Sequence, residues 1–110
     1  MTEREQDALN DILEAIGLFE GWTQAGGASF QQSAMMQSAV VYPLLVIGEA
    51  VGRLSDEVTA QQSQIPWRRI RRFRNIATHD YAHVDLNIVW QIVSHDLAPL
   101  QQAARYLLRS

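Results

Sequence analysis

The chain has 110 residues, of which 47% are hydrophobic and 19% are charged. These values are typical of one globular domain, and they exclude a disordered chain or an enzyme that encloses a large cleft between two lobes of its own. The lack of cysteine excludes disulfides, a thiolate nucleophile and cysteine-bound zinc. The longest apolar stretch, 39–48, is about half of the roughly 20 residues that a membrane span needs. We therefore expect one cytoplasmic domain over residues 1–110, with no signal peptide and no membrane contact.

Charge is distributed unevenly along the sequence. The first 57 residues hold nine acidic residues against two arginines, a net charge of −7, whereas residues 58–110 hold seven arginines against three aspartates, a net charge of +4. All nine basic residues are arginine, and five of them lie between Arg68 and Arg74. Such a cluster indicates either a face that binds phosphate or a helix face that is simply solvated.

A first helix is predicted at the start of the chain. Thr2 and Glu5 form a capping-box pattern, in which each side chain hydrogen-bonds the backbone of the other residue. Apolar residues then recur at helical spacing as far as Phe19, while acidic residues fill the other face. The glycine pair at 26–27 is predicted to end this segment.

A second helical segment opens with another capping-box pattern, Ser29 with Gln32, and is predicted to run to about Gln61. Pro43 lies inside this segment and removes one backbone donor, which predicts either a kink or a break. The residues around it, 40–47, are apolar almost all round. That pattern is typical of a helix that is central to the core or lies under a partner chain.

Two further helices are predicted after a polar connection. Pro66 suits the first turn of a helix that runs to about His79. After a short loop at 81–84, Asp85 is a suitable N-cap for a last helix, which Pro99 is expected to bend near its middle. The predicted fold class is therefore all-α, an up-and-down bundle of four or five helices.

One arginine of the cluster stands apart from the others. When the helix is projected at about 100° per residue, Arg74 falls inside the apolar stripe, about 40° from Ile70. The other four arginines fall outside the stripe: Arg68, Arg69, Arg71 and Arg72. A charge inside the stripe is costly unless it is paired or faces a polar cleft. We expect either a buried Arg74 held by an acid such as Glu49, or an Arg74 that lines a cleft or interface and binds phosphate.

Several polar residues follow Arg74 closely. With Asn75, His79, Asp80 and Tyr81, a cation, an amide, a titratable base and a phenol occur within eight residues. An ideal helix does not bring His79 beside Arg74, but the helix is predicted to end there. A lone histidine at a helix end is more often a cap or a surface residue. A metal site is disfavoured because the neighbouring histidine falls in a predicted loop, and we expect neither a metal nor a cofactor.

The run 74–81, Arg-Asn-Ile-Ala-Thr-His-Asp-Tyr, resembles the R-x-x-x-x-H-x-Y signature of HepT-like proteins, a branch of the HEPN superfamily. Flanking segments agree with this family in the same order: 47–50, 65–67, 84–85 and 89–90. The resemblance implies a small HEPN-like helical bundle that forms a homodimer. In such a dimer the two motif helices face each other across a shared cleft.

The resemblance also implies a function, the toxin half of a type VII-like HEPN/MNT toxin–antitoxin system. Toxins of this kind are metal-independent endoribonucleases, and the catalytic pair would fall on Arg74 and His79. The implied partner is a minimal nucleotidyltransferase antitoxin that transfers AMP to the motif tyrosine, here Tyr81.

Supporting roles follow for the neighbouring residues. Asn75 is expected to orient a neighbour or to contact the nucleotide, with Asp80 and Glu49 as further supporting residues. The outward arginines would make salt-sensitive contacts to RNA phosphates: Arg68, Arg69, Arg71 and Arg72.

Two alternatives to a ribonuclease stay open at this stage. One is a non-catalytic helical dimer that binds the nucleotidyltransferase and presents Tyr81 or a nucleotide to it. The other is a structural dimer in which Arg74 forms only an ion pair at the interface. The intact pair of arginine and histidine favours the ribonuclease.

Overall fold

The computed structural model describes residues 1–19, 34–79 and 86–109; of residues 34–40, 75–79, 86 and 88 it describes the backbone alone. These ranges form α1 (Glu3–Gly17), α3 (Ala34–Gly52), α4 (Asp56–Ala60), α5 (Trp67–His79), α6 (Leu86–Gln91), a π-helical turn η3 (Ile92–Asp96) and α7 (Leu97–Arg109). No strand occurs in the three described ranges. The predicted all-α fold class is therefore confirmed.

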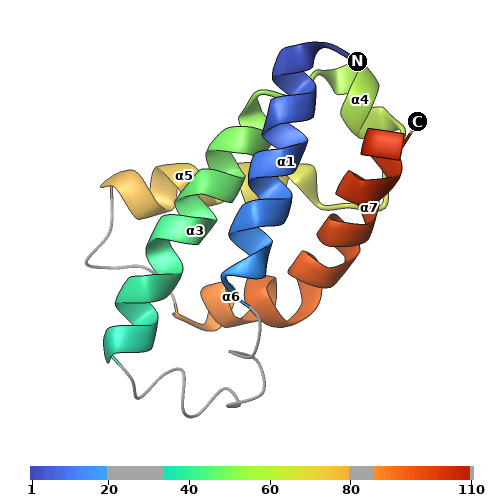
Figure 1. Cartoon of the computed structure of the whole chain (residues 1–110). Helices are drawn as coiled ribbons and strands as arrows, with labels where there is room; N and C mark the ends of the chain where they lie inside the picture. Colours follow the sequence, from blue (N-terminus) through green and yellow to red (C-terminus); the bar gives the residue numbers. More distant parts are fainter. Residues whose placement is uncertain (20–33, 80–85, 110) are drawn as a thin grey trace.

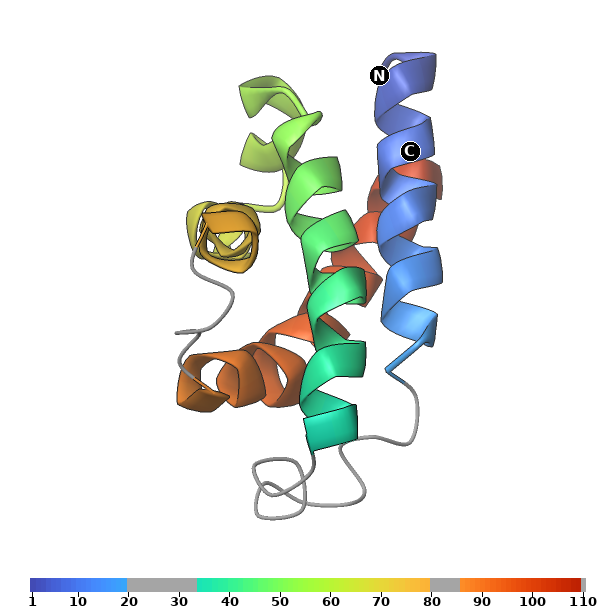
Figure 2. The ribbon, with the colours of Figure 1, turned by 90° about the vertical axis from the view of Figure 1, so that its left-hand side faces the viewer.

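Helix α3 is at the centre of the arrangement. It packs against α1 on one side and against α5 on the other, and α1 also packs against α7. Helices α1, α3 and α7 run up and down beside one another, while α5 lies across them (Figure 1). Figure 2 shows α5 end-on beside α3, so the axes of these two helices cross steeply. None of the described helices combines the length and the apolar character needed to cross a membrane.

The core consists of apolar side chains at helical spacing from each long helix. The large side chains that are almost completely buried come from five of the described elements: Leu9, Ile12, Leu44, Ile47, Ile70, Ile92, Leu100 and Leu107. Burial of each such side chain contributes about 1.5–3 kcal/mol relative to its exposure. The helices are therefore held together mainly by one shared apolar core.

The start of α1 is capped as predicted, and the cap also reaches α4. The hydroxyl of Thr2 accepts a hydrogen bond from the backbone N–H of Glu5 at 3.1 Å, and Glu5 Oε1 accepts one from the N–H of Thr2 at 3.0 Å. The other oxygen of Glu5 accepts hydrogen bonds from the N–H and the hydroxyl of Ser55 at 3.0 and 2.9 Å. Ser55 is itself the N-cap of α4. The buried Glu5 therefore joins the first turns of two helices.

The predicted end of the first helix is wrong. Helix α1 ends at Gly17, after which the N–H groups of Leu18 and Phe19 each donate to the carbonyl three residues earlier. Phe19 is nevertheless buried in the core. The apolar periodicity thus correctly predicts that Phe19 is a core residue, because a residue just beyond the end of a helix can also pack into the core. The glycine pair at 26–27 and the second capping-box pattern lie outside the described residues.

The second predicted segment is also shorter than expected. Helix α3 continues through Pro43, so the proline does not break it. It ends at Gly52, and the predicted continuation to about Gln61 is wrong because Ser55 caps a separate short helix, α4. Helices α1 and α5 cover part of the apolar surface of α3 and bury Leu44 and Ile47, whereas Tyr42 stays exposed.

The second half of the chain follows the prediction more closely. Helix α5 ends at His79 as expected, and the carbonyl of Pro66, directly before the helix, accepts the N–H of Ile70 at 3.1 Å. The bend expected near Pro99 occurs as η3, beyond which α7 runs in a different direction from α6 (Figure 1). A proline lacks the N–H that a regular helix needs, which explains an irregular turn just before it. The predicted loop at 81–84 and its N-cap Asp85 are not among the described residues.

The carboxylate of Glu5 makes the stability of this fold depend on pH. Hydrogen bonds from the backbone of Thr2 and of Ser55 lower the pKa of Glu5 from 4.5 to about 2. Because the folded-state pKa is lowered, the stabilisation is complete above pH 4.5 and is lost as the pH falls towards about 2. We expect Glu5→Gln to lower the Tm at neutral pH and to flatten the decline of the Tm across this acidic range.

Thermal unfolding followed by circular dichroism at a series of pH values measures this effect. Glu3→Gln is the matched control, because Glu3 is an exposed acid in the same first turn of α1. An identical acid transition in wild type and Glu5→Gln would contradict the role assigned to Glu5.

Candidate nucleic-acid interface

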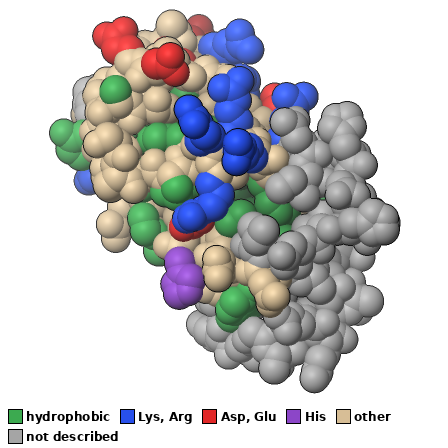
Figure 3. All heavy atoms as spheres, turned by 180° about the vertical axis from the view of Figure 1, so that it is seen from behind, with side chains coloured by type: hydrophobic (Ala, Val, Ile, Leu, Met, Phe, Trp, Pro, Cys, Tyr) green, Lys and Arg blue, Asp and Glu red, His purple; other side chains and the backbone are tan. Residues whose placement is uncertain are grey.

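The arginine cluster forms the outer face of α5. The inner face buries Ile70 and Phe73, with Trp67 half-buried at the start of the helix. The indole N–H of Trp67 donates to the carbonyl of Gln62 at 2.9 Å, which ties this end of the helix to the preceding turn. The five arginines of the helix are all exposed: Arg68, Arg69, Arg71, Arg72 and Arg74. Figure 3 shows how basic side chains gather on this side of the molecule.

One of these arginines is already paired. Arg69 donates to both carboxylate oxygens of Asp96 over distances of 2.7–3.2 Å. The side chain of Asp96 is 9% exposed, so this carboxylate needs a partner, and the pair ties α5 to the C-terminal helices. Arg69 is therefore less available for RNA than the other arginines of α5. The sequence gives one indication that Asp96 pairs with a basic residue, because Asp96 is an isolated acid between core positions of the last predicted helix.

Arg74 lies at a close approach of α5 to α3. Gly48 is buried at this point, and a Cβ added to it would lie 3.1 Å from both the Cβ and the backbone nitrogen of Arg74. The same atom would lie 3.2 Å from the carbonyl oxygen of Ile70. Contacts this short force neighbouring atoms to shift, so glycine is what allows the two backbones to approach each other here.

The side chain of Arg74 is exposed and lines a pocket of about 290 Å³ between α3 and α5. The expectation of a buried arginine held by Glu49 is wrong, because Glu49 lies 3.7 Å from Arg53 instead. No carboxylate in the described ranges pairs with Arg74. The helical projection correctly places this residue on the side that faces α3. Since Gly48 stands opposite, the guanidinium extends into the pocket rather than into the core.

This pocket is strongly basic. Its lining comes from α1, α3, α5 and the turn after α3: Arg4, Gly48, Glu49, Gly52, Arg53, Arg71 and Arg74. Guanidinium groups present forked donors that suit the oxygens of a phosphate group. Arg4 is 67 positions away from Arg71 and carries no local signal of a role in the pocket, so the sequence alone does not predict its contribution.

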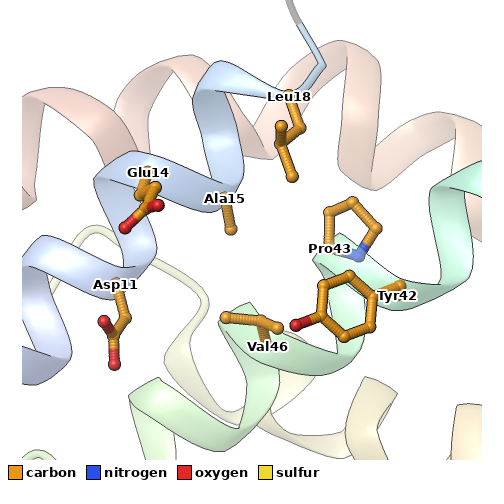
Figure 4. Close-up of a pocket in the computed structure, with 7 residues that line it drawn as sticks. All are labelled: Asp11, Glu14, Ala15, Leu18, Tyr42, Pro43 and Val46. Carbon is orange, nitrogen blue, oxygen red and sulfur yellow. The ribbon is translucent and has the colours of Figure 1, made fainter.

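A second groove, of about 280 Å³, lies between α1 and α3 and has a different chemistry. Figure 4 shows Tyr42, Pro43 and Val46 of α3 across from residues of α1. The α1 side of the groove includes two carboxylates, those of Asp11 and Glu14, and no cation lines it. Such a lining repels phosphate, so the pocket beside Arg74 is the better candidate for binding RNA.

The rest of the motif is described only in part. Asn75 and His79 belong to α5, with His79 as its last residue, and only their backbone is described. Asp80 and Tyr81 lie outside the described residues. In a helix, the Cα atoms of Arg74 and His79 are about 7.5 Å apart along the axis and about 140° apart around it. One copy of α5 therefore carries these two residues on different sides.

Comparison of the sequence with known protein families identifies the family to which the chain belongs. A family model described as "Ribonuclease HepT-like" matches residues 12–107, which is most of the chain. The chain belongs to the HepT-like family of the HEPN superfamily. The resemblance inferred from the motif and its flanks is therefore confirmed.

Named relatives of this HepT-like protein agree with a ribonuclease. "Probable ribonuclease HepT" of Thermococcus cleftensis is 33% identical over 102 residues, which cover 92% of this chain and 93% of that protein. A Methanocaldococcus jannaschii protein named "Gamma-glutamylcyclotransferase and putative RNase" is 35% identical over 95 residues, which cover 86% of this chain. The match spans only 43% of that longer protein. No solved structure matches this chain.

The close approach at Gly48 predicts opposite effects for two similar substitutions. Replacing glycine by alanine inside a helix ordinarily raises the free energy of unfolding by up to about 1 kcal/mol. At Gly48 the added methyl group meets the backbone of α5, so we expect Gly48→Ala to lower the free energy of unfolding by about 1–3 kcal/mol. At Gly52 the added Cβ lies 3.6 Å from Arg71 Nε, which is an ordinary contact. We expect Gly52→Ala to leave stability unchanged or to raise it.

Urea denaturation of both variants measures this difference. Gly52→Ala is the control, because it lies one turn further along the same helix. Equal stability of the two variants would show that α3 and α5 do not meet at Gly48 as tightly as described.

Proposed function

We propose that this protein is the toxin of a type VII-like HEPN/MNT toxin–antitoxin system and that it acts as an endoribonuclease. The observation that carries the proposal is an exposed Arg74 in a basic pocket of a HepT-like protein. An arginine with a purely structural role would be buried or paired, as Arg69 is with Asp96. An exposed guanidinium among other arginines instead suits a polyanion such as RNA. The printed names of the relatives support the same substrate class.

The proposed reaction uses RNA and protein side chains alone. The 2′-oxygen of a ribose attacks the adjacent phosphorus, and the bond from phosphorus to the 5′-oxygen breaks. The products are a 2′,3′-cyclic phosphate and a 5′-hydroxyl. One group must take the proton of the 2′-hydroxyl, and another must give a proton to the leaving 5′-oxygen. His79 suits proton transfer because imidazole titrates near neutral pH, and Arg74 suits the negative charge on the phosphate.

We propose that the active form is a homodimer. The reaction has two proton transfers, whereas one chain offers one motif histidine. Arg74 and His79 also lie on different sides of one α5, so a single motif does not direct both residues at one phosphate. A twofold axis beside α5 would bring two arginines and two histidines to a common cleft. Asn75 and Asp80 would then orient these groups.

Substitution of the motif pair tests the ribonuclease. We expect Arg74→Ala and His79→Ala each to slow the cleavage of single-stranded RNA by at least about 100-fold, because each removes a group that acts in the transition state. For Arg74→Ala we expect an unchanged Tm, because its side chain is exposed. Rates from a labelled oligonucleotide and thermal unfolding curves measure the two effects. Expression of the wild type should arrest growth, and His79→Ala should relieve the arrest.

Two outcomes would contradict this assignment. Cleavage at the wild-type rate by both variants would show that the motif is not catalytic. Growth arrest by both variants without any RNA cleavage would favour the non-catalytic dimer that presents Tyr81 or a nucleotide to its partner.

We propose that a minimal nucleotidyltransferase antitoxin controls the protein at Tyr81. Attack of the phenolic oxygen on the α-phosphorus of ATP would form a phosphodiester to AMP and release pyrophosphate. The added phosphate and adenine would stand two residues beyond His79 in the sequence. They would compete with RNA for the same arginine and histidine. The modified toxin would therefore be inactive because AMP occupies the site that binds RNA.

Tyr81→Phe separates catalysis from this control, because it keeps the ring and removes the acceptor oxygen. We expect the variant to cleave RNA at about the wild-type rate before and after incubation with the nucleotidyltransferase and ATP. The wild type should lose activity and gain the mass of one or more AMP groups. Mass spectrometry and the cleavage assay measure both effects, and undiminished cleavage by fully modified wild type would contradict the proposed mode of control.

A further inference from the structure

We propose that the basic pocket between α1, α3 and α5 is a subsite for the RNA backbone, where it binds a phosphate next to the one held by Arg74. This inference rests on the ribonuclease proposed above and gives that site a defined path for its substrate. It assigns a role in RNA binding to Arg4, from the first turn of α1, and a specific position to Arg71.

The pocket gathers like charges from distant parts of the sequence. Arg71 and Arg74 lie about one turn apart on α5, Arg4 comes from α1, and Arg53 follows directly after α3. Glu49 is the one carboxylate in the lining. Arg53 is paired with carboxylates, but the guanidinium groups of the other three arginines repel one another around a pocket of about 290 Å³ and lower the stability of the empty protein. A bound anion would remove this cost, which indicates a ligand of negative charge.

The nearby carboxylates do not neutralise the arginines that face the ligand. Both Asp11 and Glu49 form ion pairs with Arg53, so that arginine is held as part of the wall. The remaining three guanidinium groups are exposed and have no carboxylate partner within the described ranges: Arg4, Arg71 and Arg74. Three forked donors thus remain for phosphate oxygens.

Arg71 and Arg74 lie beside two glycine positions of α3, of which Gly48 is the one where a side chain would clash. A Cβ on Gly48 would meet Arg74, and a Cβ on Gly52 would lie 3.6 Å from the Nε of Arg71. Arg71 and Arg74 therefore lie beside positions of α3 that have no side chain. Arg71 and Arg74 are three residues apart, which separates their Cα atoms by about 4.5 Å along the axis of α5. If Arg74 holds the phosphate that is cut, Arg71 is placed to hold a neighbouring one.

The charges around the pocket also indicate the direction in which an RNA strand would cross it. The second groove, between α1 and α3, is lined by Glu14, which has no ion-pair partner in the described ranges and would repel the backbone of RNA (Figure 4). Arg4 lies on the opposite side of Asp11 along α1, two turns closer to the N-terminus. The strand is therefore expected to run from α5 across the pocket towards the start of α1.

The test compares Arg4→Gln and Arg71→Gln with Arg105→Gln in the full chain. Arg105 is an exposed arginine of α7 that lines a different groove, so its loss changes the net charge equally. Binding is measured by fluorescence anisotropy with a single-stranded RNA that carries 2′-O-methyl groups and so cannot be cut by its own 2′-oxygen. A second assay measures the cleavage of the unmodified RNA.

We expect Arg4→Gln and Arg71→Gln each to weaken RNA binding about tenfold at low salt. Each should also reduce the slope of log affinity against log salt by about 0.7, the value for one phosphate contact on a single strand. Arg105→Gln should bind like the wild type. The Tm of both pocket variants should be unchanged or higher, because each removes a repulsive charge.

Failure of this inference is distinct from failure of the ribonuclease. Equal binding by all three variants, with normal cleavage by the wild type, would overturn the subsite and leave the ribonuclease standing. Weaker binding by the two pocket variants, with no cleavage by the wild type, would support the subsite and overturn the catalytic proposal. Thermal stabilisation by inorganic phosphate that depends on Arg71, with unchanged RNA affinity, would assign the pocket to a free anion and overturn its role in RNA binding.

Discussion

The contact between α3 and α5 at Gly48 determines where the chemistry of this protein lies. Glycine inside a helix costs about 0.5–1 kcal/mol relative to alanine, and here it allows two helix backbones to meet. Helix α3 is held on its other side by α1, so the contact sets the position of α5 relative to the whole core. Beside this contact, the side chain of Arg74 is exposed and lines the pocket. The glycine thus accounts for the close packing of α5 at the edge of the pocket.

Ion pairs divide the arginines into two groups with different roles. Arg69 is fixed by the buried Asp96, and Arg53 is fixed by carboxylates of α1 and α3. Both pairs connect separate elements, so these arginines stabilise the arrangement of the helices. The arginines without such partners in the described ranges face solvent or the pocket. A chain with a formal net charge of −3 can therefore present a basic surface, because much of its acidic charge lies on α1, away from the outer face of α5.

The sequence predicts the features that depend on residues close together in the chain. The Thr2 cap, the limits of α5 and the side of the helix on which Arg74 lies all follow from spacing within one turn or one helix. The partner of Ser55 is Glu5, 50 positions away, and no local pattern indicates it. The exposure of Arg74 could not be predicted for a similar reason, since it depends on how closely α3 and α5 pack. Gly48 lies opposite Arg74, 26 positions away in the sequence, and no local pattern indicates this contact.

The three unpaired pocket arginines, Arg4, Arg71 and Arg74, contribute little to the stability of the fold, and this separates the site from the core. They are exposed, they bury little apolar surface, and their mutual repulsion opposes their being brought together. Helix α5 nevertheless holds Arg71 and Arg74 in place, because Ile70 and Phe73 anchor its inner face and Gly48 allows it to approach α3. The apolar packing that fixes the position of α5 therefore offsets the electrostatic repulsion between the charges. A phosphate backbone that enters this pocket meets donors that are already in place, so binding does not have to supply the energy of bringing them together.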